Sequence, residues 1–257
     1  MSRMRRLVFV SLLVLALPTL VHAATSPVVA AAKRTASAKS VTFQMSARVA
    51  VPGQGAVSMT GTGVQRGTDA KLYMRMRGQG VALRFDALLL QERGSYVMYM
   101  RSPAFRAQLP PGKSWVRVDL SKQAAGVGLD VTSLLSASQS YAPFEKALVS
   151  TTRVGREVVA GRPATHYRAV VDLRRAASAL PEYAKQLAVI ERQTGVRLGR
   201  VPYHVWVGTD GRLRRVRFSM PTGTRTARGT SVLTMTFVAF DRPVTVAAPP
   251  RAQVFSP

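Results

Sequence analysis

The sequence predicts an α+β fold, in which one strongly curved antiparallel sheet carries helices packed on its concave face. Hydrophobic side chains recur at every second position through most of the chain, which is typical of half-buried strands. The turns between these segments are too short for the crossovers that parallel pairing needs. Two stretches, 120–149 and 174–193, instead space their apolar residues by three and four, which is typical of helices. The strands are too many for one flat sheet, so we expect the sheet to curve.

The composition allows one ordinary apolar core. The chain has 257 residues, of which 47% are hydrophobic, and this is enough apolar material for a single folded domain. It has no cysteine, which excludes disulfides, cysteine-ligated metals, cysteine nucleophiles and thioether lipid anchors. Lys and Arg number 37 against 12 Asp and Glu, giving a formal net charge of +25. A surface of this sign attracts phosphates and carboxylates.

The first 23 residues are expected to be a secretory signal. Three arginines in the first six residues precede an apolar run at 7–17, and Val21-His22-Ala23 supplies small or modest side chains before the cleavage point. The run is shorter than the roughly 20 apolar residues of a spanning helix. We expect cleavage near Ala23 and one mature domain at 24–257, with a net charge of 34 − 12 = +22. That domain would act outside the cytoplasm, which argues against nucleic acid as a partner; a retained membrane anchor is the alternative.

The elements are expected in a regular order. An alanine-rich first helix or loose tail lies at 24–40, and Gly195 ends the helix expected at 174–193. Asp210-Gly211 predicts a tight hairpin because Asp-Gly readily takes positive φ. Gly61-Thr62-Gly63 is expected to be a turn or bulge between strands. Strands are expected at 41–51, 70–77, 81–91, 95–101, 115–119, 151–159, 164–173, 203–207, 212–220, 230–241 and 244–247.

Residues suited to catalysis are few. The mature chain keeps only His166 and His204, on separate expected strands and with no acidic neighbour in the sequence. The acidic residues are scattered, with no close carboxylate pair. No nucleophile elbow, phosphate-cradling loop, zinc-protease motif or dinucleotide fingerprint is present. We therefore expect no enzyme activity, no metal and no cofactor.

Methionine is concentrated on the expected strands, and it adapts its shape easily to varied apolar ligands. Ordinary core packing is the alternative explanation. The methionines in question are Met45, Met59, Met74, Met76, Met98, Met100, Met220 and Met235.

Basic residues cluster near the expected last hairpin, at Arg212, Arg214, Arg215 and Arg217, and continue to Arg225 and Arg228. A solvated face and an anion-binding site are both compatible with this cluster. Elsewhere, basic residues fall mostly on strand faces opposite the apolar set, as Arg75 and Arg77 do beside Met74 and Met76.

Four motifs, together with their order along the chain, resemble the actinobacterial envelope lipoproteins of the LppX/LprG type. Residues 203–216 (YHVWVGTDGRLRRV) resemble their aromatic-x-V-W-V-D-x-D-G-(K/R)-L-x-R hairpin, and 154–167 (VGREVVAGRPATHY) resemble their G-x-E-x-V-x-G-x-x-T-x-H-Y segment. Residues 113–120 (KSWVRVDL) and 240–244 (FDRPV) resemble their G-K-W-x-x-V-D and F/Y-x-x-P-V segments. The resemblance covers roughly residues 28–250.

The resemblance implies a LolA-like half-barrel sheet with helices over its hollow, and a carrier of lipids or lipoproteins in the cell envelope. These lipoproteins are tethered through a lipidated cysteine at the signal cleavage site, which this chain lacks. We expect a non-lipidated, monomeric carrier that holds acyl chains between the sheet and the helices. A non-enzymatic envelope sensor of the same fold and a wall polyanion-binding protein are the alternatives. An anionic membrane surface or wall polymer is the second expected partner.

The expected lipid cavity combines two apolar surfaces. Each buried methylene contributes about 0.8 kcal/mol, so acyl chains can bind without any polar motif. From the sheet, the lining residues are expected to be Leu72, Met74, Met76, Leu83, Phe85, Met98 and Met100. From the helices, they are expected to be Leu134, Leu135, Leu148, Leu187 and Ile190.

Overall fold

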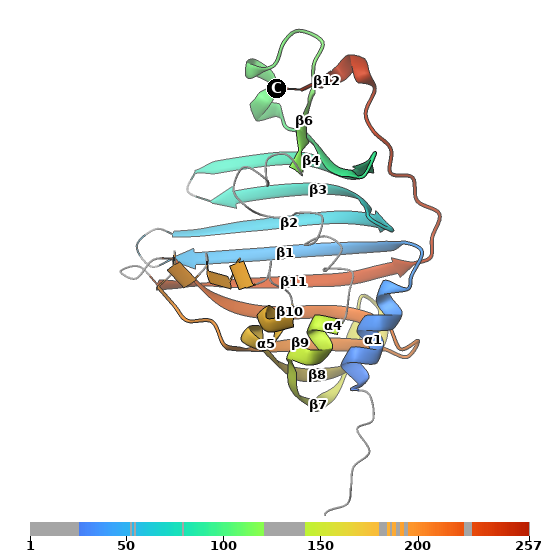
Figure 1. Cartoon of the computed structure of the whole chain (residues 1–257), viewed down its shortest axis with the longest axis vertical. Coiled ribbons are helices and arrows are strands. Elements are labelled where there is room, and N and C mark those ends of the chain that lie inside the picture. The colour runs from blue at the N-terminus through green and yellow to red at the C-terminus, as the bar shows by residue number, and fades with distance from the viewer. Residues whose placement is uncertain are drawn as a thin grey trace, which may run out of the picture.

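The computed structural model describes residues 26–256 apart from 52, 54, 79, 121–141, 180–183, 186, 189–190, 193–194 and 224–227. These residues form one large, curved, unclosed sheet of twelve strands with helices at one end (Figure 1). The curved sheet with helices that the sequence predicts is therefore confirmed. In the part of the chain that is described, no helix is both long enough and apolar enough to span a membrane.

The sheet consists of two antiparallel meanders joined along β1 and β11. Its strand order is β12-β6-β5-β4-β3-β2-β1-β11-β10-β9-β8-β7, and β12 pairs with β6 in parallel. The strands are β1 (Val41–Val51), β2 (Gly55–Arg66), β3 (Asp69–Gly78), β4 (Val81–Glu92), β5 (Ser95–Arg101), β6 (Trp115–Asp119), β7 (Leu148–Val159), β8 (Arg162–Asp172), β9 (Arg200–Gly208), β10 (Leu213–Gly223), β11 (Arg228–Phe240) and β12 (Val254–Phe255). The helices are α1 (Pro27–Ala36), α4 (Ala142–Ala147) and α5 (Leu173–Ala179), with 3-10 turns η1 (Pro103–Gln108) and η2 (Arg251–Gln253).

Several expected elements differ from the structure. Residues 55–66, expected to contain a turn at Gly61-Thr62-Gly63, form the continuous strand β2. The strand expected at 244–247 is absent, and this segment runs unpaired toward β12. Of the helix expected at 120–149, only α4 lies within the described residues, and Leu148 already belongs to β7. The alanine-rich start forms α1 and is not a loose tail.

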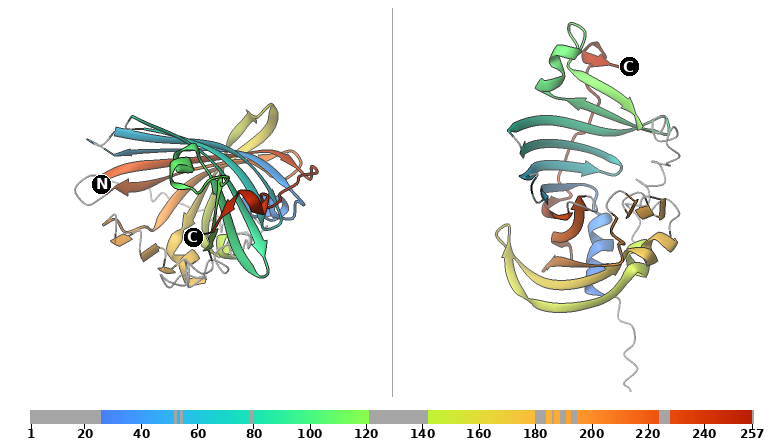
Figure 2. Two further views of the ribbon diagram at one scale, coloured as in Figure 1. Left: turned by 90° about the horizontal axis from the view of Figure 1, so that it is seen from above. Right: turned by 90° about the vertical axis from the view of Figure 1, so that its left-hand side faces the viewer.

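Helix α1 covers the β8–β10 end of the sheet. Pro27 lies in its first turn, where a missing N–H costs no helical hydrogen bond, and Lys33 and Arg34 lie in its last turn, where positive charge is favourable. Its apolar side packs Val28, Ala31 and Ala32 against Ala169, Val205 and Leu213. Figure 1 shows α1, α4 and α5 over strands β7 to β10, and Figure 2 shows β7 and β8 curving around them. We call the helix-covered side of the sheet the inner face and the other side the outer face.

A second core lies on the outer face at the opposite end. There Leu88 and Leu90 of β4, Val97 and Tyr99 of β5 and Trp115 of β6 pack around Val246 of the C-terminal segment. Cross-strand register places these sheet residues on the face opposite to Phe85 and Met74. The sheet is therefore anchored on different faces at its two ends.

Candidate functional site

The central strands align large apolar side chains on the inner face. Met45 lies opposite Met235 on one side and Gly61 on the other. Gly61 in turn lies opposite Met74, and Met74 opposite Phe85. Directly paired residues of neighbouring antiparallel strands point to the same side. The register therefore creates an apolar row that crosses five strands, and its members Met45, Met74, Phe85 and Met235 are half-buried.

A parallel row lies closer to the helix end of these strands. Phe43 pairs with Phe237 and with Gly63, and Gly63 pairs with Leu72. The two glycines leave the space that these large side chains occupy. A Cβ atom added at Gly63 would lie 2.5 Å from Phe43 Cζ and 2.8 Å from Leu72 Cδ2, and one at Gly61 would lie 3.0 Å from Met74 Cγ. Gly61 and Gly63 are thus packing positions within the inner face.

A hollow of about 340 Å³ lies between this face and the C-terminal end of α1. We call it the inner hollow. Its sheet side is apolar apart from Gln65, and Thr35, Ala36 and Ala38 bound it from the helix side. The sheet residues that line it include Val41, Phe43, Leu213, Met235 and Phe237. A space of this size and lining can take part of an acyl chain without a polar partner.

A buried hydrogen-bond relay fixes the helix over the hollow. The Thr35 hydroxyl donates to the Ala31 carbonyl oxygen at 2.8 Å, and the Thr35 hydroxyl oxygen accepts from the backbone N–H of Leu213 at 2.8 Å. Thr35 is buried, so the loss of its hydroxyl would leave the Leu213 N–H without a partner. The relay therefore holds the end of α1 in a defined position against β10.

The structure brings part of the predicted lining together. Leu72, Met74, Met76, Leu83 and Phe85 are half-buried on the inner face, in register with one another. Met98 and Met100 of β5 share this face through their pairing with Leu89 and Ala87. Leu148 instead packs against the core beneath α1, and Leu187 lies half-buried in the 184–192 region. Leu134, Leu135 and Ile190 lie outside the described residues. The assignment of these side chains to a lipid cavity stays a prediction.

The sequence-based lining set omitted the strands nearest the helix. Phe43 and Met45 of β1, and Met235 and Phe237 of β11, flank or line the inner hollow. The apolar alternation in 41–51 and the methionine at 235 are the sequence features that could have indicated these residues as lining. The sequence did not show that β1 and β11, far apart in the chain, are adjacent strands.

The outer face carries a groove of about 660 Å³, which we call the outer groove, and its lining includes Met45, Gly61 and Met74 beside polar residues. Tyr73, Arg75, Arg84 and Asp86 lie on one side of it. Arg75 pairs directly with Arg84 across β3 and β4, a like-charge arrangement that is unfavourable without a counter-ion. Within the described residues, neither arginine forms an ion pair. The remaining outward-facing lining consists of Gln44, Ser46, Thr60, Thr62, Thr234 and Thr236.

The two histidines lie on separate strands, as expected, and the sheet brings them next to each other and to an acidic residue that is distant in the sequence. His166 Nδ1 lies 2.8 Å from Glu157 Oε1, and His166 Nε2 lies 2.9 Å from His204 Nδ1. Trp206 Nε1 donates to Glu157 Oε2 at 2.9 Å, and its ring stacks on His166. Register between β7, β8 and β9 brings these residues together on the outer face. Among the described residues, no group of three or more potential metal ligands is present.

The charges around this cluster oppose protonation of His204. Burial lowers the pKa of His204, and its neighbours His166, Arg217 and Arg168 lower it further, while Glu157 raises it. The pKa of Glu157 is also lowered, first by the hydrogen bond from Trp206 and then by His166 and Arg215. The cluster is therefore a hydrogen-bonded polar network on a basic surface.

Comparison with known proteins identifies likenesses among solved structures. No family model and no curated protein sequence matches the chain. It is similar to LprF from Mycobacterium bovis, with a TM-score of 0.46 and 14% identity, covering 88% of this chain and 96% of that one. It is similar to the lipoprotein LppX from Mycobacterium tuberculosis, with a TM-score of 0.43 and 15% identity, covering 86% and 100%.

A third likeness is to an outer membrane lipoprotein-sorting protein domain from Vibrio parahaemolyticus, with a TM-score of 0.28 and 9% identity, covering 80% of this chain and 87% of that one. What this chain binds is inferred below from its own residues.

Proposed function

We propose that this chain is a non-enzymatic carrier that binds acyl chains of a lipid or lipoprotein along its inner face. The observation that carries the proposal is the apolar row of β1–β4 and β11, which leads to the inner hollow beside α1. Its methionines and phenylalanines are half-buried and offer apolar area to a ligand. Burial of each methylene group contributes about 0.8 kcal/mol, so chain length would set much of the affinity.

Blocking the inner face with a large side chain tests this function. Met76 lies on the inner face opposite Leu83, so Met76→Trp would fill space that an acyl chain needs. We expect at least about tenfold weaker binding of a fluorescent fatty acid, equivalent to about 1.4 kcal/mol. Tyr73→Trp is the matched control, because Tyr73 lies on the outer face of the same strand, three residues from Met76, and is 45% exposed. Equal binding by wild type and both folded variants would overturn the proposal.

The outer face supports a second candidate function, attachment to anionic membranes or wall polymers. Arg75 and Arg84 meet in the outer groove without a carboxylate partner among the described residues, and a bound anion would relieve their repulsion. Attraction between exposed charges weakens as the Debye length falls from about 10 Å at 0.1 M salt to about 3 Å at 1 M. Acyl burial depends on apolar area and should persist in salt.

A salt titration separates the two functions. Co-sedimentation with anionic vesicles should be lost at high salt, while fatty-acid binding should remain. A parallel loss of both would place headgroup charge within the acyl site. If vesicle binding does not depend on salt or on lipid charge, the basic surface does not direct the protein to anionic partners and contributes only to solubility. Fatty-acid binding that is undetectable at any salt concentration would leave a sensor or polyanion-binding role in place of a carrier.

The carrier is proposed to act outside the cytoplasm as a monomer after removal of residues 1–23. The basic, apolar and small-residue order of the leader supports this location. The intact mass of the exported protein should correspond to a chain that begins at Ala24. A mature protein that retains its first 20 residues would show that the leader serves as an anchor.

A further inference from the structure

Arg214 is a buried arginine that is only partly satisfied. Its residue is 4% exposed, and its Nη2 group donates to Asp210 Oδ2 at 2.7 Å. Its Nε and Nη1 groups are buried and have no hydrogen-bond partner. Gly208 makes room for the guanidinium group, because a Cβ atom there would lie 2.7 Å from Arg214 Nε. The solvated-face interpretation of the basic cluster is therefore wrong for Arg214.

Unpaired buried donors of a charged group are costly and are rare in native proteins. Burial lowers the pKa of Arg214, and the positive charges of Arg162 and Arg212 lower it further, although Asp210 opposes this. A guanidinium group stays protonated in proteins, so the site keeps a positive charge that lacks a full set of partners. An anion bound next to Arg214 would balance this charge.

A hollow of about 290 Å³ lies beside this side chain, and we call it the arginine hollow. Its volume is several times the roughly 30 Å³ that one water molecule occupies in the liquid. Four arginines and two aspartates line it, which leaves an excess of two positive charges. These residues are Arg162, Arg212, Arg214, Arg242, Asp210 and Asp241.

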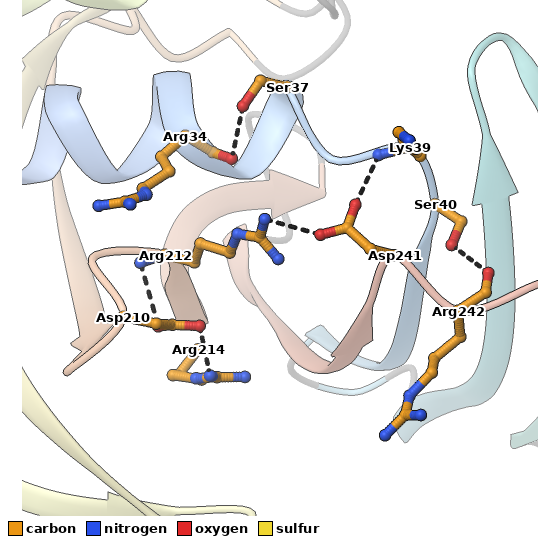
Figure 3. Close-up of polar contacts among 9 residues, drawn as sticks. All are labelled: Arg34, Ser37, Lys39, Ser40, Asp210, Arg212, Arg214, Asp241 and Arg242. Atoms are coloured by element: carbon orange, nitrogen blue, oxygen red, sulfur yellow. Dashed lines mark hydrogen bonds and ion pairs between the residues drawn. The ribbon is translucent and has the colours of Figure 1, made fainter.

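Both aspartates are already engaged. Asp210 accepts from the Arg212 backbone N–H at 3.3 Å as well as from Arg214. Asp241 accepts from the Lys39 backbone N–H at 2.8 Å and pairs with Arg212 Nη2 at 2.7 Å. Figure 3 shows Arg212 between these two carboxylates, with Arg214 on the far side of Asp210. Within the described residues, Arg162 and Arg242 have no ion pair, so they remain available to a ligand.

We propose that the arginine hollow binds a phosphate group, whose oxygens are held by Arg162 and Arg242 and whose charge balances that of the buried Arg214. A phosphate monoester carries a charge of about −1.5 to −2 near neutral pH, which matches the local excess of positive charge. A carboxylate or a phosphodiester carries only a single negative charge. Arginine donates planar, charge-assisted hydrogen bonds that suit phosphate oxygens.

The position of the arginine hollow connects it with the acyl-binding face, and this further step rests on the proposed function. The guanidinium carbons of Arg212 and Arg214 lie 4.9 Å and 5.3 Å from the centre of the Phe240 ring. On the inner face, Phe240 stacks with Phe237, which lines the inner hollow. Arg162 lies on the outer face, so a lipid with its phosphate monoester headgroup among the arginines would pass the strand end at Phe240 to place its chains along the inner face. Free phosphate or a small phosphate ester would use the same donors.

Calorimetric titration with inorganic phosphate tests the site without any acyl chain. Arg162→Gln and Arg242→Gln change exposed side chains, so the fold should survive, and each should weaken phosphate binding about tenfold through loss of a charge-assisted hydrogen bond. Arg214→Gln should abolish binding but also alters a buried position. Arg251→Gln, an exposed arginine in η2 at the other end of the sheet, is the matched control and should leave binding unchanged.

Each outcome is decisive for the phosphate site. Unchanged phosphate binding in both Arg162→Gln and Arg242→Gln would overturn it, as would acetate binding as tightly as phosphate. Stronger binding to vesicles with phosphatidic acid than to pure phosphatidylcholine, lost in the same variants, would identify a lipid headgroup as the source. Phosphate binding without this preference would identify a soluble phosphate. If the protein binds phosphate but no fatty acid, the phosphate site is supported and the acyl-carrier function is overturned.

Discussion

The two ends of the sheet are stabilised from opposite sides. At the β8–β10 end, α1 buries inner-face residues such as Ala169 and Val205, which are 0% and 2% exposed. At the β4–β6 end, the core formed by Leu88, Val97 and Trp115 lies on the outer face beneath the C-terminal segment. The chain thus uses its first described helix to cover one end and its last segment to cover the other.

This difference explains how the central strands can keep an apolar face available. A sheet packed along one whole face would have no unfilled apolar surface on that face. Here each end is anchored by its own core, and the inner-face side chains between the ends, such as Met45 and Met74, are half-buried. The two anchors therefore provide stability, and the central inner face provides the proposed binding surface.

The strongest test of the comparison removes the outer-face anchor. Trp115 is 7% exposed and its ring also lies 4.6 Å from the Arg101 guanidinium carbon. We expect Trp115→Ala to lower the free energy of unfolding by about 3–5 kcal/mol, measured by chemical denaturation. Val158→Ala, at a side chain that is 70% exposed, should change it by less than about 0.5 kcal/mol.

Hydrogen exchange shows which end the tryptophan stabilises. In Trp115→Ala, amides of β5 and β6 should exchange faster, while those of β9 beneath α1 should stay protected. Equal acceleration at both ends would show that the two cores form one cooperative unit, and the comparison drawn above would fail.

A smaller effect is expected from a methyl group added to the central inner face. Gly63→Ala places a Cβ atom against Phe43 and Leu72, and we expect a loss of about 1–3 kcal/mol of stability from overpacking. Gly155→Ala is the matched control, since a Cβ atom there meets nothing within 4 Å. If thermal denaturation shows equal changes for both variants, the inner face is looser than the register indicates.

The sequence predicted most of the sheet because alternation is a local signal. It missed β2, since Gly61 and Gly63 interrupt the apolar pattern and their partners Met74 and Phe43 are known only from the register. It missed the parallel strand β12 because two residues carry no periodicity. It assigned a strand at 244–247, where Val246 is buried by the outer-face core without strand pairing.

The candidate sites were harder to predict because they depend on long-range pairing. The apolar alternation identified Leu72, Met74 and Phe85, but only the pairing of β1 with β11 brings Phe43 next to Phe237. The arginine cluster near the last hairpin was visible in the sequence. The burial of Arg214 depends on the hairpin at Gly208 and on Phe240 from another strand, so no local pattern could reveal it.

The smallest expected effect concerns pH, and it should appear at the α1 end alone. The pKa of His204 is lowered from its ordinary value of 6.5, mainly by burial and then by His166, Arg217 and Arg168. The unfolded chain therefore binds more protons than the folded chain as the pH falls below about 6.5, and stability is lost in this window. The lowered pKa of Glu157 acts separately and only at more acidic pH, where that carboxylate becomes protonated.

Denaturation midpoints measured between about pH 7 and pH 5 should fall for the wild type and change less for His204→Gln. On acidification, the protection of amides relative to their intrinsic exchange rate should fall in β8 and β9 before it does so in β5 and β6. Identical pH profiles for the two proteins would mean that the histidine network does not couple protonation to the stability of this end.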